Sequence, residues 1–206
     1  TLSLDEVQSG FQSQGLALIH QPSHFPLADQ LIPHRDDLGK RPPIASAELL
    51  WTAHAGEHLL VSGFVHPPTE SRAWEALTIA GEADVITVKG LEGGTDLPIS
   101  RACITARMRH GKAPERLILH PRDHGSFGPD QEWQSLEVWQ DQAQDALHNQ
   151  GPLVSALRWN AGVYLWMAGW STSLEAGLEL AEATLSQGRA SSTLQALIQW
   201  RASVGG

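Results

Sequence analysis

Two carboxylates in one glycine-rich loop have the residue types and spacing best suited to chemistry in this sequence. Asp96 and Glu92 lie in the run Gly90-Leu-Glu-Gly-Gly-Thr-Asp96, directly after an apolar segment that is expected to be a strand. Ligand sites of open α/β sheets lie at the carboxyl ends of strands, and hard cations prefer carboxylate oxygens. Acidic residues among glycines are also ordinary turn formers. A cation site and a simple turn are therefore the two interpretations of this loop.

Two cationic side chains are candidates for binding an anionic ligand. Arg35 can pair with a ligand carboxylate through the two-pronged geometry of its guanidinium group, and the competing interpretation is a local ion pair with Asp29, Asp36 or Asp37. Lys89 ends the strand before the glycine-rich loop, where its ammonium group can meet a phosphate or be solvated.

Three further residue types are candidates for chemistry. Asn160 lies in an otherwise apolar helical segment, where it can reach a ligand or hydrogen-bond within the helix packing. Cys103 lies inside an apolar strand, which favours a small core residue over a nucleophile. The 10 histidines include no His-x-x-x-His pair on a segment that is expected to be helical, so a histidine metal site is not predicted.

The composition bounds the class of protein. A chain of 206 residues with 41% hydrophobic content can bury one sizeable core, which predicts a single α/β domain over residues 1–206. The formal net charge of -9 disfavours nucleic acid as a partner. A lone cysteine, no leader-like start and no long uncharged run predict a cytoplasmic protein without a membrane partner.

Proline and glycine punctuate the first part of the chain. Ser3 and Glu6 have the spacing of a capping box, which predicts a helix that ends by Gly15. The apolar run 16–19 is expected to be a short buried strand. Repeated prolines limit any helix in 22–43 to one or two turns.

From residue 44 onward, expected strands and helices alternate. Residues 44–51 and 69–80 have helical spacing, whereas 58–65 and 83–88 have the composition of strands. This alternation predicts an α/β fold with a mostly parallel sheet and helices on both faces.

An antiparallel addition and a helical end complete the expected fold. Residues 101–108 and 116–120 are expected to form a β-hairpin appended to the sheet. A closing C-terminal helical segment follows, with breaks at glycines between its helices. The helices are expected at 132–147, 152–168, 174–187 and 190–204.

Short motifs occur along nearly the whole chain in a recognisable order. They are Pro22-Ser-His-Phe-Pro26, Pro33-His-Arg-Asp-Asp-Leu-Gly39, Val65-His-Pro67, Leu157-Arg-Trp-Asn-Ala161 and Ser173-Leu-Glu-Ala-Gly177. Together with the order of the elements, these motifs resemble those of the anthranilate phosphoribosyltransferase family. Lys89-Gly-Leu-Glu-Gly-Gly is similar to the divergent second branch of that family.

The resemblance implies a function and a set of site residues. It implies transfer of phosphoribosyl from phosphoribosyl pyrophosphate to an aromatic or nitrogenous acceptor by a homodimer. Mg²⁺ on the donor would be held by Asp96, with Glu92 as its partner because Leu97 occupies the place of the family's second carboxylate. Substrate-binding roles fall to His24, Arg35, Lys89 and Asn160.

Several positions depart from the family pattern, and they suggest an alternative to the transferase function. The family's acceptor motif is mostly replaced within 41–53, and Phe25 stands where the family has a histidine, which argues against anthranilate as the acceptor. The family's donor loop, Gly-Thr-Gly-Gly-Asp, and its helical part are expected to precede Thr1. The alternative function is a non-catalytic protein on the same fold that binds nucleic acid or a metabolite.

Overall fold

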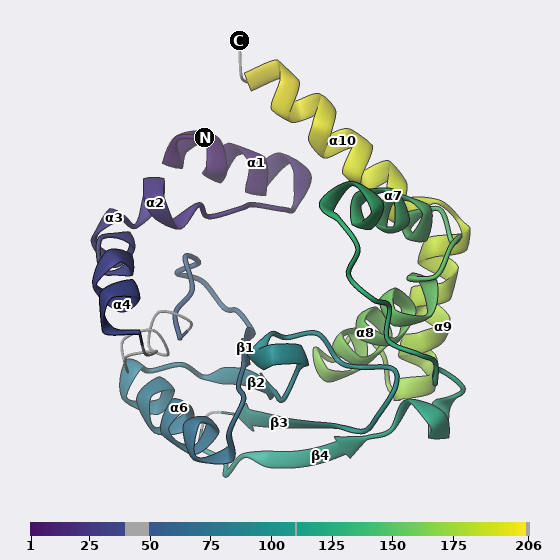
Figure 1. Ribbon diagram of the computed structural model, residues 1–206, viewed down its shortest axis with the longest axis horizontal. Helices are drawn as coiled ribbons and strands as arrows, with labels where there is room; N and C mark the ends of the chain where they lie inside the picture. The colour runs from purple at the N-terminus through teal and green to yellow at the C-terminus, as the bar shows by residue number, and fades with distance from the viewer. Residues whose placement is uncertain (40–49, 110, 205–206) are drawn as a thin grey trace. The chain divides into compact units, whose positions relative to one another are not determined.

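The computed structural model describes residues 1–39, 50–109 and 111–204, and the chain divides into two compact units (Figure 1). The first unit comprises Thr1–Ala53 with Ser191–Gly206, and the second comprises His54–Ala190. The expectation of one domain over 1–206 stays a prediction, and most of the helix expected at 44–51 lies outside the described residues.

The first unit is built from helices. They are α1 (Leu4–Gln14), α2 (Gln21–His24), α3 (Pro26–Asp29), α4 (Ile32–Leu38) and most of α10 (Arg189–Val204). The capping box at the start of α1 is confirmed, since the Ser3 backbone N–H donates to Glu6 Oε2 at 2.6 Å and the Glu6 N–H donates to Ser3 Oγ at 3.3 Å. Proline occupies the first turn of α2, α3 and α4, and all three stay short as expected.

The strand expected at 16–19 is wrong. These residues have no strand assignment, and Leu18 is 73% exposed. An apolar run forms a strand only when a neighbouring strand pairs with it, and within the described residues the sheet pairings do not include this run.

The second unit contains a four-stranded sheet in the order β1-β2-β3-β4. Its strands are β1 (Leu60–Gly63), β2 (Asp84–Val88), β3 (Cys103–Arg109) and β4 (Glu115–Leu119). Strands β1 and β2 are parallel because α6 (Pro67–Ala80) crosses between them, whereas β2–β3 and β3–β4 are antiparallel. The α/β fold and its appended hairpin are confirmed, with parallel pairing at β1–β2.

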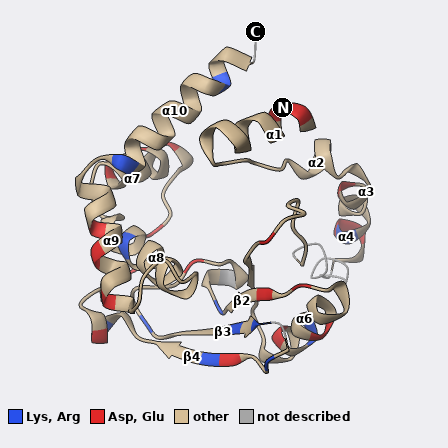
Figure 2. Ribbon diagram, turned by 180° about the vertical axis from the view of Figure 1, so that it is seen from behind, with Lys and Arg blue, Asp and Glu red and all other residues tan. Residues whose placement is uncertain are grey.

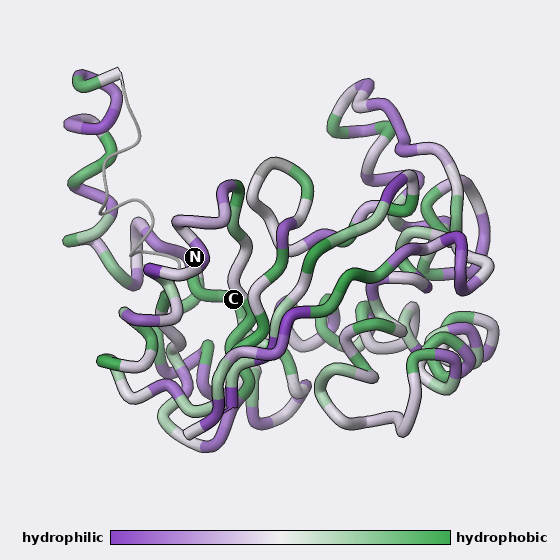
Figure 3. The backbone as a smooth tube through the Cα atoms, turned by 90° about the horizontal axis from the view of Figure 1, so that it is seen from below, coloured by the Kyte–Doolittle hydropathy of each residue, from purple (hydrophilic) through white to green (hydrophobic). Residues whose placement is uncertain are grey.

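Helices cover both faces of this sheet, as Figure 1 shows for α6 on one side and α8 (Val154–Met167) with α9 (Leu174–Ser186) on the other. Successive side chains of β2 point to opposite faces. Thr87 contacts α6, whereas Ile86 and Val88 join the main core. Figure 3 shows hydrophobic stretches that alternate with hydrophilic ones along the backbone. The core comprises Ile86, Val88, Leu97, Ile99, Cys103, Leu119, Trp159, Val163, Met167, Leu174 and Leu178.

A buried charged side chain joins α6 to the sheet. Glu70 is fully buried, and its carboxylate accepts hydrogen bonds from Thr87 Oγ1 at 2.8 Å and from Arg116 at 2.5 Å. The Trp74 indole N–H donates to Thr87 Oγ1 at 3.3 Å. The Arg116 guanidinium lies 5.5 Å from the centroid of the Trp74 ring. The buried carboxylate is therefore paired with a cation, as a buried ion requires, whereas the Arg116 side chain is 47% exposed.

The closing helical segment is confirmed, and glycine permits its closest packing. It consists of α7 (Leu136–Leu147), α8, α9 and α10. A Cβ atom placed on Gly177 would lie 2.4 Å from the carbonyl oxygen of Gly162, so α8 and α9 approach each other backbone to backbone. Within the described residues, no helix is both long and apolar enough to span a bilayer.

A histidine–carboxylate pair ties the segment before β1 to the end of α6. His58 Nδ1 lies 2.7 Å from the carbonyl oxygen of Gly56, and His58 Nε2 lies 2.7 Å from Glu82 Oε2. Both partners only accept hydrogen bonds, so the doubly protonated ring fits this geometry. The Gly56 carbonyl, and then the Glu82 carboxylate, raise the pKa of His58 above its ordinary 6.5 against the opposing effect of burial.

We expect the stabilisation from His58 to fade with rising pH. Because its folded pKa is raised, the contribution is fully present below 6.5 and is lost as pH rises through the folded value. Urea unfolding of the wild type and His58→Gln should differ by about 0.5 kcal/mol near pH 6, and by less near pH 8.5. The variant Glu82→Gln should show the same loss of pH dependence. A difference that grows with pH would contradict this assignment.

Candidate functional site

The candidate site lies at the carboxyl ends of the parallel strands β1 and β2. There the segment Lys89–Leu97, which we call the Asp96 loop, follows β2 and contains the short helix η1 (Leu91–Gly93). The Lys89 N–H donates to the carbonyl of Ile104 at 2.8 Å and anchors the start of the loop to β3. The Leu91 N–H donates to the carbonyl of Asp96 at 3.2 Å, so the loop closes on itself. This is the sheet edge at which the sequence predicts a ligand site.

Glycines allow the Asp96 loop to lie directly against the end of β1. A Cβ atom on Gly63 would lie 2.1 Å from the carbonyl oxygen of Gly93, and one on Gly90 would lie 2.2 Å from that of Gly94. Gly93 itself has φ +83°, a left-handed conformation that side chains disfavour. The backbone of this edge is therefore crowded, and glycine is required at three positions.

Two charged side chains project from this loop without partners among the described residues. Asp96 and Lys89 are both exposed, and neither side chain makes a hydrogen bond or ion pair with any residue in the described ranges. The backbone of Glu92 belongs to η1, and its side chain lies outside what the structure describes. An unpaired carboxylate and an unpaired ammonium group are thus available to a ligand. The metal role of Asp96 and Glu92 and the phosphate role of Lys89 stay predictions.

Asn160 is engaged in holding the loop. Its Oδ1 accepts from the Leu97 N–H at 2.7 Å, and its Nδ2 donates to the carbonyls of Leu97 at 3.0 Å and Ala156 at 2.9 Å. Both N–H bonds of the amide are used, which is the packing interpretation of this residue. Four residues later on α8, the Tyr164 hydroxyl donates to the carbonyl of Thr95. Residues 95 and 97, on either side of Asp96, are therefore both held by α8.

Cys103 behaves as a core residue. Its side chain is 1% exposed, and burial raises the pKa of its thiol to about 11, although Arg101 and Lys89 oppose the shift. The thiol lies 3.2 Å from the carbonyl oxygen of Lys89. A buried, protonated thiol is a poor nucleophile, which agrees with the interpretation from sequence.

The other two predicted substrate-binding residues lie in the first unit. His24 ends α2, and both its ring nitrogens are engaged, with Nδ1 accepting from the His20 N–H at 2.8 Å and Nε2 lying 2.7 Å from the carbonyl oxygen of Leu2. Arg35 lies in the last turn of α4 and is half-buried. The structure groups Lys89, Asp96 and Asn160 in the second unit and His24 and Arg35 in the first, and their substrate roles stay predictions.

The chemistry of the acidic residues limits how a metal can be held. Among the described residues, no group of three or more His, Cys, Asp or Glu side chains is arranged to bind a metal ion. Mg²⁺ needs six oxygens, and it commonly takes one or two carboxylates with the rest from water and phosphate. Asp96 fits such a site only if a phosphorylated ligand supplies further oxygens. Figure 2 shows acidic and basic residues interspersed over the elements of the second unit, with blue and red stretches next to each other on β4.

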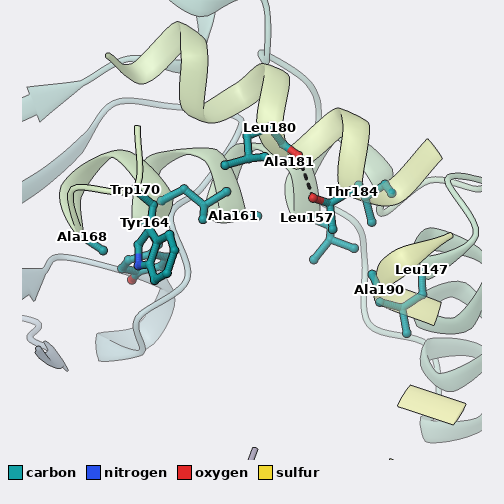
Figure 4. A pocket seen from close by; sticks show the side chains of 12 residues that line it. Leu147, Leu157, Ala161, Tyr164, Ala168, Trp170, Leu180, Ala181, Thr184 and Ala190 are labelled. Carbon is teal, nitrogen blue, oxygen red and sulfur yellow. Dashed lines mark hydrogen bonds between the residues drawn. The ribbon is translucent and has the colours of Figure 1, made fainter. Parts of the chain in front are cut away.

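A cavity of about 540 Å³ lies beside α8, between it and α9 (Figure 4). Its walls are almost wholly aliphatic, with Tyr164 and Trp170 as the aromatic members. The hydroxyl of Thr184 faces it but donates to the carbonyl of Leu180 at 2.8 Å. Tyr164 therefore has its ring at this cavity and its hydroxyl on the Asp96 loop. Tyr164 is not among the residues predicted from the sequence, although its position four residues after Asn160 places both on one helix face.

Sequence comparison finds curated proteins that are similar to this chain. No family model matches the chain. A search of curated proteins finds anthranilate phosphoribosyltransferase of Verminephrobacter eiseniae, 28% identical over 89% of this chain and 54% of the relative. It also finds that of Chromobacterium violaceum, 27% identical over 100% of this chain and 60% of the relative. The chain resembles the anthranilate phosphoribosyltransferases.

Solved structures of anthranilate phosphoribosyltransferases have a fold similar to that of this chain. The enzyme from Thermus thermophilus matches with a TM-score of 0.74 at 22% identity. The match covers 95% of this chain and 58% of the Thermus thermophilus chain. A variant from Saccharomyces cerevisiae with Mg bound has a TM-score of 0.80 at 13% identity, over 98% of this chain and 59% of its own. The expected resemblance and the α/β fold are thus confirmed. The chain spans little more than half the length of these proteins.

Proposed function

We propose that this chain is part of a phosphoribosyltransferase that transfers phosphoribosyl from phosphoribosyl pyrophosphate to an aromatic or nitrogenous acceptor. The observation that carries the proposal is the Asp96 loop at the carboxyl edge of β1 and β2. It presents a carboxylate and an ammonium group that pair with no other described residue. Its similarity to anthranilate phosphoribosyltransferases supplies the reaction class.

The chemistry of this transfer needs positioning and charge neutralisation. The acceptor forms a bond to ribose C1 as the bond from C1 to pyrophosphate breaks, and pyrophosphate leaves with the electron pair while the acceptor loses a proton. Mg²⁺ bound to the donor neutralises the leaving oxygens. Asp96 would hold that ion, with Glu92 as the second carboxylate, and Lys89 would pair with a phosphate oxygen.

The remaining candidate residues concern the acceptor. Arg35 would pair with an acidic group of the acceptor through its guanidinium, and His24 would lie near it. The replaced motif at 41–53, of which 40–49 lie outside the described residues, leads us to propose an acceptor other than anthranilate. Substrate contact by Asn160 would have to use its remaining acceptor capacity, because its donors are bonded to backbone carbonyls.

We expect Asp96→Asn to weaken Mg²⁺-dependent binding of phosphoribosyl pyrophosphate at least about tenfold, which corresponds to about 1.4 kcal/mol. The loss arises because a neutral amide is a much weaker ligand for a hard cation than a carboxylate is. The fold should be unaffected, since the Asp96 side chain is exposed. Calorimetric titration of the donor into the intact protein, with and without Mg²⁺, measures the effect.

The matched control is Asp141→Asn, which removes one exposed carboxylate from α7 and should leave donor affinity unchanged. Equal donor affinities for the wild type and Asp96→Asn would reduce Asp96 to a turn residue. That result would favour a non-catalytic protein that binds a metabolite or nucleic acid on the same fold.

A further inference from the structure

Two polar side chains on one face of α8 hold the backbone on both sides of Asp96. Asn160 forms a pair of hydrogen bonds with the N–H and carbonyl of Leu97, at 2.7 and 3.0 Å. Tyr164, one helical turn later, donates its hydroxyl hydrogen to the carbonyl of Thr95. These contacts join residues 63 and 69 positions apart in sequence, so they exist only because α8 packs on the loop.

The two contacts leave Asp96 fixed at its backbone and unbonded at its carboxylate. Leu97 is 2% exposed and belongs to the core, whereas the Asp96 side chain between it and Thr95 is exposed. The Asp96 carbonyl also accepts from the Leu91 N–H at 3.2 Å. The backbone of three successive residues is therefore tied down, yet the side chain in the middle has no protein partner in the described part of the chain.

Such an arrangement lowers the cost of binding a cation at one carboxylate. A single protein ligand binds weakly, and ordering a loop at the moment of binding would weaken it further. A loop that is already ordered avoids that loss. We propose that Asn160 and Tyr164 are positioning residues that preorganise Asp96 for the Mg²⁺ of the donor, an inference that rests on the proposed function.

The environment of Tyr164 suits this role. Its ring lies in the wall of the apolar cavity between α8 and α9 (Figure 4). Burial raises the pKa of the Tyr164 hydroxyl well above its ordinary value. An interaction with the Thr95 side chain opposes this shift, and the charge of Asp96 adds to it. The hydroxyl stays protonated at any physiological pH, so it remains a donor to the Thr95 carbonyl.

Two variants, each of which removes one hydroxyl group, test this proposal. Tyr164→Phe deletes the hydrogen bond to Thr95 and keeps the ring in the cavity wall. Thr184→Val is the matched control, because it removes a hydroxyl that lines the same cavity but bonds only to the carbonyl of Leu180. Both variants should fold, since neither removes apolar volume.

Two readouts are compared in the intact protein. Hydrogen exchange of the Leu97 amide should be at least about threefold faster in Tyr164→Phe than in the wild type, and unchanged in Thr184→Val. The Mg²⁺ concentration for half-maximal binding of phosphoribosyl pyrophosphate should rise about fivefold in Tyr164→Phe, with donor affinity at saturating Mg²⁺ retained. A purely structural role for Tyr164 would not change the Mg²⁺ requirement selectively.

The outcomes separate failure of this inference from failure of the proposed function. Unchanged exchange at Leu97, or faster exchange with an unchanged Mg²⁺ requirement, would overturn the positioning role. If the wild type showed no Mg²⁺-dependent donor binding, the proposed function would fail, while the exchange measurement would still show whether α8 orders the loop.

Discussion

Replacing Gly90 by alanine is expected to destabilise the protein by about 3 kcal/mol, near the upper end for inserting a methyl group into a packed site. The new Cβ atom would lie 2.2 Å from the carbonyl oxygen of Gly94 and 2.8 Å from that of Asp96. Both are backbone atoms, so no side chain can rotate away, and the Asp96 loop itself must move. Urea unfolding measures the loss, and Mg²⁺-dependent donor binding should fall with it.

Gly94→Ala is the matched control for this prediction. Gly90 and Gly94 have nearly the same conformation, with φ -78° and ψ -172° against φ -74° and ψ -174°. At Gly94 the nearest atom to a new Cβ is the carbonyl oxygen of Leu91 at 3.2 Å, so a shift of a few tenths of an ångström is sufficient. We expect a loss below about 1 kcal/mol. Equal losses in the two variants would show that crowding is not the reason for glycine at position 90.

Removing the cation that pairs with the buried carboxylate of α6 should also have a large effect. Arg116→Met is expected to lower the free energy of unfolding by about 2 kcal/mol, because it leaves a carboxylate buried without its counter-charge. The Arg116 side chain is itself 47% exposed, which keeps the loss below that of a fully buried pair. Glu70 is 0% exposed, and its remaining partner is the Thr87 hydroxyl at 2.8 Å. Denaturant unfolding at pH 7 measures the change.

The double variant Arg116→Met with Glu70→Gln separates charge from packing. Glutamine keeps an acceptor for Thr87 and carries no charge, so it should recover at least about half of the loss. No recovery would show that Arg116 acts through its contact with Trp74, 5.5 Å from the ring centroid, rather than through the buried charge.

Local sequence patterns were sufficient for most elements of the second unit. Strand-like composition predicted β2 and the β3–β4 hairpin, and the prolines and glycines predicted where α6 and the closing helices begin and end. These signals work because strand and helix periodicity, proline and glycine act within a few residues. Glu70, Trp74 and Leu77 also share one helix face, so the burial of Glu70 had a detectable signal in the sequence.

Tertiary structure alone decided which groups meet. The apolar run 16–19 had the composition of a strand but no pairing partner among the described residues, and strand pairing is not encoded in the run itself. The sequence left two roles open for Asn160, and its bonds to Leu97, 63 positions away, show that it holds the loop. Tyr164 had no local signal of its contact with Thr95, because hydrogen bonds between distant segments depend on how helix and sheet pack. The sequence thus determined that Asp96 follows a strand in a glycine-rich loop, whereas packing of α8 decided that its backbone is held and its carboxylate is left unpaired.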